Sequence, residues 1–200
     1  MNKLAIALLA SSILTSLPTK AESPLQADIN ADYPHLEKLF KHLHSNPELS
    51  FQETETSKRL AAELKALGYS VSTGVGKTGV VAVMKNGKGP TVLIRADMDA
   101  LPLQEKSGLA YASTKTQVNL DGVEMPVMHA CGHDMHVTAL VGTAKQMAAR
   151  KDQWQGTLVL IGQPAEEAYG GAQAMLDDGL YSKFPTPDYA LALHVGSADV

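Results

Sequence analysis

Residues 157–167 carry the sequence TLVLIGQPAEE, in which an apolar run ends at two adjacent carboxylates. The apolar part predicts a buried strand, and Glu166 and Glu167 leave that strand at its carboxyl end. In open α/β sheets, ligands bind beyond the carboxyl ends of the strands. Neighbouring residues that leave a strand point in different directions, so one glutamate can bind a metal while the other faces a substrate water. Taken alone, the pair fits a solvated acidic turn better.

Two further apolar runs end on side chains of a similar kind. Residues 91–94 lead into Asp97 and Asp99, and residues 189–193 lead into His194. Three predicted strands therefore each finish on a potential ligand or on a group that supports one. This is the arrangement that a metal centre assembled along one edge of a sheet requires.

Residues 129–136 carry the sequence HACGHDMH, which holds three of the seven histidines of the chain and its single cysteine. Cys131 and His133 are spaced so that both can reach one ion from a tight loop, and both residue types are common metal ligands. A lone cysteine or histidine is more often an ordinary core or surface residue, but this clustering favours a metal site. A helical run follows in residues 137–149, and Asp134 is predicted to be its N-cap.

The rest of the chain alternates between helical and extended patterns. The predicted helices and strands are, in order, residues 33–43, 53–67, 70–72, 79–84, 91–94, 137–149, 157–161 and 189–193. Gly68 ends the second helix, and Asn86 and Gly87 form a turn. This order predicts an α/β sheet with helices packed on it. No linker divides residues 22–200 into two domains.

The first residues predict export. Lys3 supplies a positive charge, residues 4–17 are mostly apolar, and residues 19–21 offer the small residues that a signal peptidase recognises. We therefore expect residues 1–21 to be a signal peptide, cleaved after Ala21, and the mature protein to be secreted or periplasmic. The polar residues within the apolar stretch argue against a membrane anchor, and no later run is long enough to span a bilayer.

The composition is that of an ordinary globular protein. The net charge is −4 and 44% of the residues are hydrophobic, with no basic stripe that would bind nucleic acid. A single cysteine cannot form an internal disulfide in an exported protein. The Cys131 thiol is therefore either free or coordinated to a metal.

Five motifs occur in the order that is typical of one family of enzymes. They are HSNPELSFQE at residues 44–53, RADMDALP at 95–102, HACGHDMH at 129–136, PAEE at 164–167 and LHV at 193–195. On these motifs, the chain resembles the metal-dependent amidohydrolases of the aminoacylase/carboxypeptidase family, in particular the hippurate hydrolase and auxin-conjugate hydrolase branch. The resemblance spans nearly all of residues 33–200. It implies a zinc-peptidase-like catalytic domain, with a three-layer sheet and flanking helices.

The resemblance also implies a ligand set and a general base. Two divalent ions, manganese or zinc with cobalt or nickel as alternatives, are expected to bind four residues of this chain, namely Cys131, His133, Glu167 and His194. Glu166 matches the general base, which takes a proton from a metal-activated water.

Further residues are assigned to the surroundings of the metal site. Asp99 matches a catalytic aspartate that orients the site. Asp97 stands where many relatives have a ligand histidine, so its role stays open. His129, Asp134 and His136 are expected to support the ligands, because ligand orientation commonly depends on such partners.

The implied reaction is hydrolysis of the amide bond of an N-acyl amino acid, which gives a carboxylate and a free amino acid. A dipeptidase or carboxypeptidase acting on short peptides is the nearest alternative. Relatives are longer, with a lid or dimerisation domain and one more ligand histidine. We therefore expect residues 22–200 to be the N-terminal part of a catalytic domain, incomplete at the C-terminus, whose full-length form is compatible with a homodimer.

Two other classes of function fit part of the sequence. A thiol hydrolase would use Cys131 as nucleophile with a nearby histidine as base, but the carboxylates of Glu166 and Glu167 would raise the pKa of the thiol. A non-catalytic module would bind metal or a peptide without turnover. A chelator distinguishes a thiol hydrolase from a metallohydrolase, because it abolishes the activity of a metallohydrolase and leaves that of a thiol enzyme unchanged.

Overall fold

The computed structural model describes residues 22–196, so the expected signal peptide at residues 1–21 lies outside the described residues. Its centre is a sheet of five strands in the order β1-β2-β6-β3-β7. The strands are β1 Ser70–Val75, β2 Gly79–Asn86, β3 Thr91–Asp97, β6 Gly156–Gln163 and β7 Tyr189–Ala192. Strand β3 runs parallel to both of its neighbours, β6 and β7, whereas β2 is antiparallel to β1 and β6.

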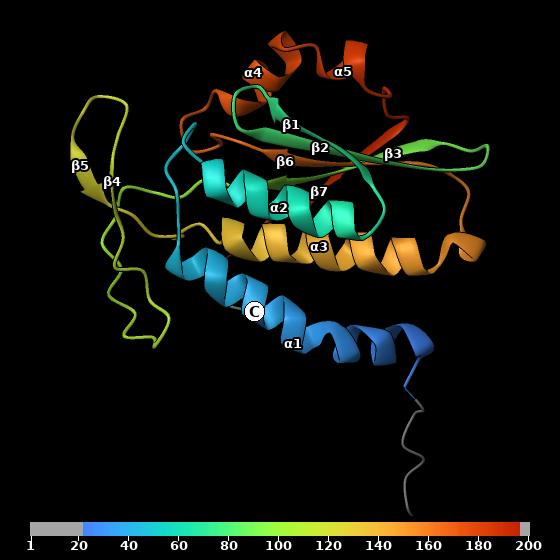
Figure 1. Cartoon of the computed structure of the whole chain (residues 1–200), viewed down its shortest axis with the longest axis horizontal. Helices are drawn as coiled ribbons and strands as arrows, with labels where there is room; N and C mark the ends of the chain where they lie inside the picture. Colours follow the sequence, from blue (N-terminus) through green and yellow to red (C-terminus); the bar gives the residue numbers. More distant parts are fainter. Residues whose placement is uncertain (1–21, 197–200) are drawn as a thin grey trace, which may run out of the picture.

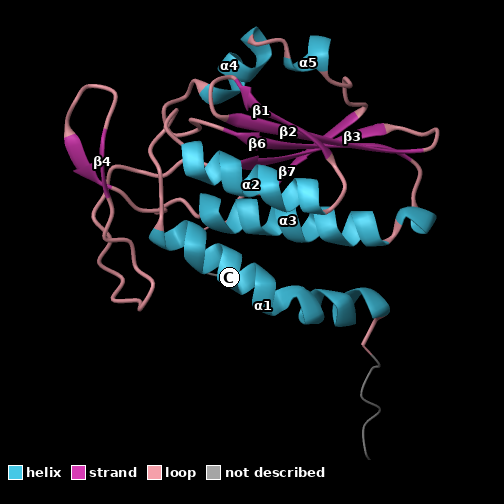
Figure 2. Ribbon diagram, viewed as in Figure 1, coloured by secondary structure: helices cyan, strands magenta, loops and turns pink. Residues whose placement is uncertain are grey.

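Helices cover both faces of this sheet (Figure 1). Helices α2 and α3 lie against one face and α1 packs on the outer side of α3, while α4 and α5 cover the other face (Figure 2). The helices are α1 Pro24–Ser45, α2 Thr54–Ala66, α3 His133–Ala149, α4 Gly171–Asp177 and α5 Leu180–Lys183, with a 3-10 turn at Lys151–Gln153. The predicted fold class, an α/β sheet with flanking helices in three layers, is confirmed.

The strand predicted at residues 157–161 is the middle strand of the sheet, β6. Leu158 and Leu160 enter the core shared with α2 and α3, whereas Val159 and Ile161 enter the core shared with α4 and α5. Because both faces of the strand are buried, the sequence shows a continuous apolar run instead of an alternation of apolar and polar residues.

Three strands, β3, β6 and β7, run in the same direction and end at the same edge of the sheet. Asp97 at the end of β3 pairs in register with Gln163 at the end of β6. The chain segments that leave these strands therefore meet, as the three polar strand ends predicted. Strand β6 lies between β2 and β3, so the turn at Asn86 and Gly87 joins two strands that are not paired with each other.

Helix α1 is longer than its periodicity predicted, since it begins at Pro24 and not near Tyr33. The Ser23 hydroxyl caps it by accepting a hydrogen bond from the Gln26 amide at 3.2 Å. Pro34 lies inside the helix. The periodicity of the sequence indicated only the part of the helix that begins near Tyr33.

The predicted N-cap of α3 is wrong. The helix begins at His133, and its N-cap is Gly132, which has a left-handed backbone. The Met135 amide donates to the Gly132 carbonyl at 3.0 Å. Asp134 is already helical, and its carboxylate lies 2.6 Å from Nδ1 of His44. Because a distant segment of chain engages this carboxylate, local spacing could not reveal its partner.

A hairpin that the sequence did not predict projects from the body of the molecule (Figure 1). It consists of β4 Thr116–Val118 and β5 Glu124–Pro126. Asn119 shapes its turn, because the side-chain oxygen accepts hydrogen bonds from the amides of Asp121 and Val123.

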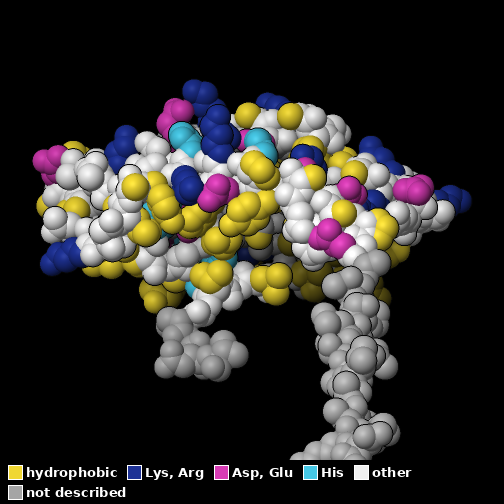
Figure 3. Space-filling model, turned by 90° about the horizontal axis from the view of Figure 1, so that it is seen from below, with side chains coloured by type: hydrophobic (Ala, Val, Ile, Leu, Met, Phe, Trp, Pro, Cys, Tyr) yellow, Lys and Arg dark blue, Asp and Glu magenta, His cyan; other side chains and the backbone are white. Residues whose placement is uncertain are grey.

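The α1 side of the molecule carries apolar side chains scattered among basic and acidic ones (Figure 3). A groove of about 440 Å³ runs between α1 and α3, and its apolar lining includes Leu25, Ile29, Leu36 and Met147.

Within residues 22–196, no helix combines the length and the apolar character needed to cross a membrane.

We predict that Leu160→Ala destabilises the fold by about 2–5 kcal/mol, because it removes a fully buried side chain from the middle strand and leaves a cavity. Urea unfolding measures the change in the free energy of unfolding. Leu120→Ala is the control, since its side chain is 70% exposed on the hairpin and the expected change is within about 0.5 kcal/mol. Equal effects of the two substitutions would contradict the placement of β6 in the core.

Candidate metal centre

Three predicted ligands, Cys131, His133 and Glu167, meet beyond the carboxyl ends of the parallel strands. Each offers one ligand atom, and these atoms all lie within 4.8 Å of one another. His133 is fully buried in the first turn of α3. The fourth predicted ligand, His194, follows β7 and places its Nε2 atom 3.4 Å from the sulfur of Cys131. The structure therefore brings all four predicted ligands together.

The ring of His133 is oriented by the segment that follows β3. Its Nδ1 donates a hydrogen bond to the carbonyl oxygen of Asp99 at 2.7 Å, so Nε2 is the atom that carries the free electron pair. This Nε2 is buried and has no hydrogen-bond partner among the described residues. It lies 3.8 Å from Oε2 of Glu166 and 3.9 Å from Oε1 of Glu167. A neutral imidazole with one nitrogen held and the other free is the form that binds a metal.

The buried polar atoms of the cluster fit a bound cation. Oε1 of Glu167, like Nε2 of His133, is buried without a hydrogen-bond partner in the part of the chain that the structure describes. Buried polar atoms are almost always paired, so two such atoms side by side need an explanation. Sulfur, imidazole nitrogen and carboxylate oxygen are together a donor set that zinc accepts, and carboxylates also suit manganese. The residues present therefore fit a divalent ion.

Asp99 fixes the backbone that carries the two glutamates. Its Oδ1 accepts the amide of Glu166 and its Oδ2 accepts the amide of Glu167, each at 3.0 Å. Burial alone would raise the pKa of Asp99, but hydrogen bonds from His133, Ser50 and these amides lower it below its ordinary value. The side chain of Glu166 is 35% exposed, so it can face a substrate water while Glu167 turns to the cluster.

The thiol of Cys131 lies in a negative environment. Burial, and then the carboxylates of Glu167, Glu166 and Asp97, raise the pKa of the thiol to about 11. A thiol with this pKa is protonated at neutral pH and is a poor nucleophile. The geometry thus agrees with the sequence argument against a thiol hydrolase.

A second group of donor atoms adjoins the first. Asp97, His133, His136 and His194 each place one potential ligand atom within 4.8 Å of the others. Both ring nitrogens of His136 already have partners, however. Nδ1 donates to Oδ1 of Asp97, and Nε2 accepts the amide of Val195 at 2.9 Å. His136 therefore holds the chain next to His194, which favours the predicted supporting role over that of a ligand.

Asp97, whose role the sequence left open, is fully buried at the start of this chain of contacts. Nη1 of Arg95 lies 2.8 Å from Oδ2 of Asp97, and His136 binds the other oxygen. His194 donates from Nδ1 to the carbonyl oxygen of Val195 at 2.6 Å, which leaves its Nε2 free to face the cluster. The contacts therefore run from β3 through His136 to the segment that carries His194.

His44, at the end of α1, joins two buried acidic side chains behind the cluster. Its Nδ1 lies 2.6 Å from Oδ2 of Asp134, and its Nε2 lies 3.0 Å from Oε1 of Glu105. Burial lowers the pKa of His44, but the hydrogen bonds and charges of Glu105 and Asp134 outweigh it and raise the pKa above its ordinary value. This contact anchors the first turn of α3 directly beside the predicted ligand His133.

His129 belongs to neither group of donor atoms among residues 22–196. It is buried, and neither ring nitrogen has a hydrogen-bond partner in the same range. Burial lowers the pKa of His129 to about 4, so the ring is neutral at physiological pH. The structure does not show it supporting a ligand.

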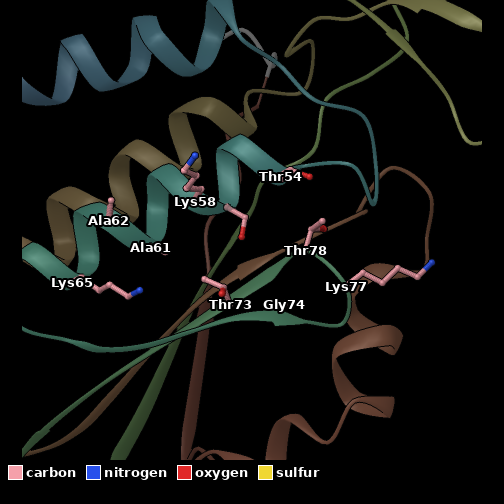
Figure 4. Close-up of a pocket in the computed structure, with 10 residues that line it drawn as sticks. Thr54, Lys58, Ala61, Ala62, Lys65, Thr73, Gly74, Lys77 and Thr78 are labelled. Atoms are coloured by element: carbon pink, nitrogen blue, oxygen red, sulfur yellow. The ribbon is translucent and has the colours of Figure 1, made fainter.

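A cavity of about 500 Å³ lies away from the cluster, between α2 and the hairpin formed by β1 and β2 (Figure 4). Its polar and basic lining includes Thr54, Lys58, Lys65, Thr73, Lys77 and Thr78, and none of the four predicted metal ligands. The hydroxyl of Thr78 donates a hydrogen bond to the buried carboxylate of Glu53.

An α/β sheet in which the loop after β6 and the start of α3 bring glutamate, cysteine and histidine into one cluster defines a metal-binding α/β protein. A family model described as Peptidase family M20/M25/M40 matches residues 93–200, which is more than half of the chain. The chain belongs to this family.

Individual relatives agree with the resemblance drawn from the motifs. The hippurate hydrolase of Campylobacter jejuni is 48% identical over 159 residues, which are 79% of this chain and 38% of that protein. The IAA-amino acid hydrolase ILR1-like 4 of Arabidopsis thaliana is 43% identical over 141 residues, which are 70% of this chain and 30% of that protein.

A solved structure extends the agreement to the fold. The YXEP protein of Bacillus subtilis, described as a dinuclear metal binding peptidase, matches with 36% identity and a TM-score of 0.72, over 82% of this chain and 43% of that chain. This chain therefore spans less than half the length of each of the three proteins.

Sequence reasoning gave no individual role to three side chains around the site, Arg95, Glu105 and Glu53. Arg95 and Glu53 lie inside the quoted motifs, and that membership was their only signal. Glu105 lies outside every motif, and its partner His44 is 61 residues away. A contact over that distance leaves no local pattern.

We predict that His136→Gln and His136→Asn differ in their effect on metal binding. Glutamine can place its oxygen near Nε2 and still accept the Val195 amide, whereas asparagine is too short and leaves that amide unpaired. Titration with Co²⁺ is expected to show affinity within about threefold of wild type for His136→Gln and a loss of about tenfold or more for His136→Asn. Loss of a bound ion in both variants would show that His136 is itself a ligand.

We predict that the contribution of His44 to stability depends on pH. Because its folded pKa is raised, the stabilisation is fully present below the unfolded pKa of about 6.5 and is lost as pH rises through the folded pKa. His44→Phe keeps an aromatic ring against Tyr111 but removes both acidic contacts. Urea unfolding with chelator present should show a larger difference from wild type at about pH 6.5 than at about pH 9. A difference that is constant with pH would contradict this.

Proposed function

We propose that this chain carries the metal centre of an amidohydrolase that cleaves the amide bond of N-acyl amino acids, with hippurate-like compounds as the substrate class. The observation that carries the proposal is the cluster of Cys131, His133 and Glu167 with the partly exposed Glu166 beside it. The names of two relatives, hippurate hydrolase and IAA-amino acid hydrolase, support the substrate class. Since the chain spans less than half of these relatives, the activity is proposed for the whole protein.

Two divalent ions, zinc or manganese, are part of this proposal, and Cys131, His133, Glu167 and His194 are the residues of this chain that would hold them. The description of the YXEP protein as dinuclear supports the number of ions. When bound, such ions polarise the scissile carbonyl and lower the pKa of the attacking water.

Glu166 is the proposed general base. Its carboxylate takes a proton from the water while the water oxygen bonds to the carbonyl carbon, and it gives the proton to the amine nitrogen as the carbon–nitrogen bond breaks. The products are a carboxylate and a free amino acid. The position of Oε2 of Glu166, 3.8 Å from Nε2 of His133, supports this role because it lies at the edge of the ligand cluster.

Asp99 has a positioning role in the same proposal. It holds the amides of both Glu166 and Glu167 with its carboxylate, and it orients the ring of His133 with its carbonyl oxygen. One residue thereby sets the relative placement of the base and two ligands.

A peptidase that acts on short peptides is the second candidate. The description of the YXEP protein as a peptidase favours it. Peptide and N-acyl amino acid hydrolysis break the same kind of bond, so the same residues would serve both. The relative rates on an N-benzoyl amino acid and on a dipeptide separate the two candidates.

The remaining sequence-based expectations are also proposals. Residues 1–21 are proposed to be a signal peptide that directs the protein to the periplasm or the exterior, and residues 22–200 to be part of one catalytic domain. The pattern of charge, apolar stretch and small residues supports the first proposal. A homodimer of the full-length form is proposed from the family resemblance alone.

We predict that Glu166→Gln lowers kcat for hydrolysis of an N-benzoyl amino acid by about 10²–10⁴-fold, because an amide cannot accept the proton. Metal content, measured by elemental analysis, should stay at the wild-type value. Glu124→Gln, on the projecting hairpin, is the matched control and should leave kcat unchanged. Chelator should abolish turnover and added zinc or manganese should restore it. Full activity of Glu166→Gln, or of the chelated protein, would refute the mechanism.

A further inference from the structure

The motif at residues 44–53 ends in Glu53, a glutamate that the metal cluster does not use. Glu53 is fully buried, in the loop between α1 and α2. Burial raises the pKa of Glu53, which shows that the surroundings disfavour its charged form. A carboxylate in such a place costs free energy unless its hydrogen bonds compensate. Its hydrogen bonds therefore indicate what it does.

Two backbone amides and one hydroxyl bind the carboxylate of Glu53. Its Oε1 accepts the amide of Phe51 at 3.0 Å and the amide of Ala165 at 2.7 Å. Its Oε2 accepts the hydroxyl of Thr78, which lines the cavity beside α2 (Figure 4). Phe51 is a local partner, but Ala165 is 112 residues away and directly precedes Glu166.

Three consecutive amides of the loop after β6 are thus bound by two buried carboxylates. Glu53 binds the amide of Ala165, and Asp99 binds the amides of Glu166 and Glu167. Consecutive backbone amides that converge on an anion form a nest, the arrangement with which proteins often bind phosphate. Here the anions are side chains of the protein itself.

The loop that these carboxylates hold has an unusual backbone. Ala165 has a φ of 46°, a left-handed conformation that residues other than glycine rarely adopt. Its carbonyl accepts the amides of Gly170 and Gly171 at 3.3 and 3.1 Å, which folds the loop back on itself. A Cβ atom on Gly171 would lie 1.5 Å from the carbonyl oxygen of Pro164, so the return is tight. Such a conformation persists only where the surrounding structure holds it.

We propose that Glu53 is a positioning residue for Glu166 and Glu167: by binding the Ala165 amide, it fixes the backbone from which the general base and a metal ligand project. The proposal rests on the proposed function for the roles of those two glutamates. Ser50, in the same segment, donates to Oδ2 of Asp99 at 2.6 Å. The segment after α1 therefore contacts the loop directly through Glu53 and also orients Asp99.

Glu53→Gln and Glu53→Asp separate position from charge. Glutamine keeps a side-chain oxygen for the amides of Phe51 and Ala165, and its NH₂ group can donate to the hydroxyl oxygen of Thr78. Aspartate keeps the charge but is one methylene shorter, which withdraws it from the Ala165 amide. We expect kcat to stay within about threefold of wild type for Glu53→Gln and to fall by about ten- to a hundredfold for Glu53→Asp, with KM changed much less.

Titration of the same variants with Co²⁺ tests the proposal without a substrate, because Glu167 is a proposed ligand. Glu53→Asp is expected to weaken Co²⁺ binding by about tenfold, while Glu53→Gln keeps the wild-type affinity. A wild-type protein that binds Co²⁺ but does not hydrolyse N-acyl amino acids would contradict the proposed function alone. The difference between the two variants in Co²⁺ affinity would still decide the role of Glu53.

Leu64→Ala is the control for a merely structural role, since Leu64 is fully buried in α2 and belongs to the core. It should lower the thermal midpoint while leaving kcat and Co²⁺ affinity per folded molecule unchanged.

Thr78→Val removes one hydrogen bond to Glu53 and keeps the proposal testable if Glu53→Asp does not fold. It should lower kcat and Co²⁺ affinity in the same direction by about threefold.

Three results would overturn the proposal. The first is a Glu53→Asp variant with wild-type kcat and Co²⁺ affinity. The second is a loss that follows stability alone, so that Leu64→Ala shows it equally. The third is a Glu53→Gln variant as impaired as Glu53→Asp, because a side-chain oxygen held at the Ala165 amide would then not be sufficient to preserve the site.

Discussion

The carboxylate of Asp99 accepts hydrogen bonds from the Ser50 hydroxyl and from the amides of Glu166 and Glu167, and the ring of His133 lies against the same residue. These groups come from the loop after α1, the loop after β6 and the start of α3. Since Asp99 itself follows the end of β3, it ties two loops and a helix end to that strand. The relative placement of Glu166, Glu167 and His133 depends on this buried group.

The site concentrates negative charge where burial disfavours it. Asp97 and Asp99 are buried within the protein, and Glu166 and Glu167 stand at the cluster. Burial and then the charges of Glu167, Glu166 and Asp97 raise the pKa of the Cys131 thiol. The guanidinium of Arg95 pairs with Asp97, and hydrogen bonds from His133, Ser50 and two backbone amides stabilise Asp99. Oε1 of Glu167 and Nε2 of His133 have no such partner among residues 22–196. The part of the cluster left without hydrogen bonds is thus the part whose chemistry suits a cation.

Much of the fold was predictable, because the physical signals were local. The apolar run at residues 157–161 needs burial on both faces, which the middle of a sheet provides, and it forms β6. The start of α1 was predicted too late, because the helical periodicity was recognised only from Tyr33 onward. The N-cap of α3 was predicted wrongly at Asp134, because the competing partner, His44, comes from another helix. Local preference is overruled wherever a long-range contact offers a stronger hydrogen bond.

The sequence by itself determined the ingredients of the site: three strand ends that carry acids or histidine, one cysteine and histidine pair, and an apolar pattern that forces β6 into the core. Strand order and register, which only the folded chain decides, determined that β3, β6 and β7 end at one edge. Tertiary structure also decided which polar groups are free to face a metal and which are held by contacts within the protein. His136 and Glu53 are residue types that commonly bind metals. Nε2 of His136 instead accepts the amide of Val195, and Oε1 of Glu53 accepts the amide of Ala165. Such contacts join residues far apart in the chain, and no spacing within the sequence records them.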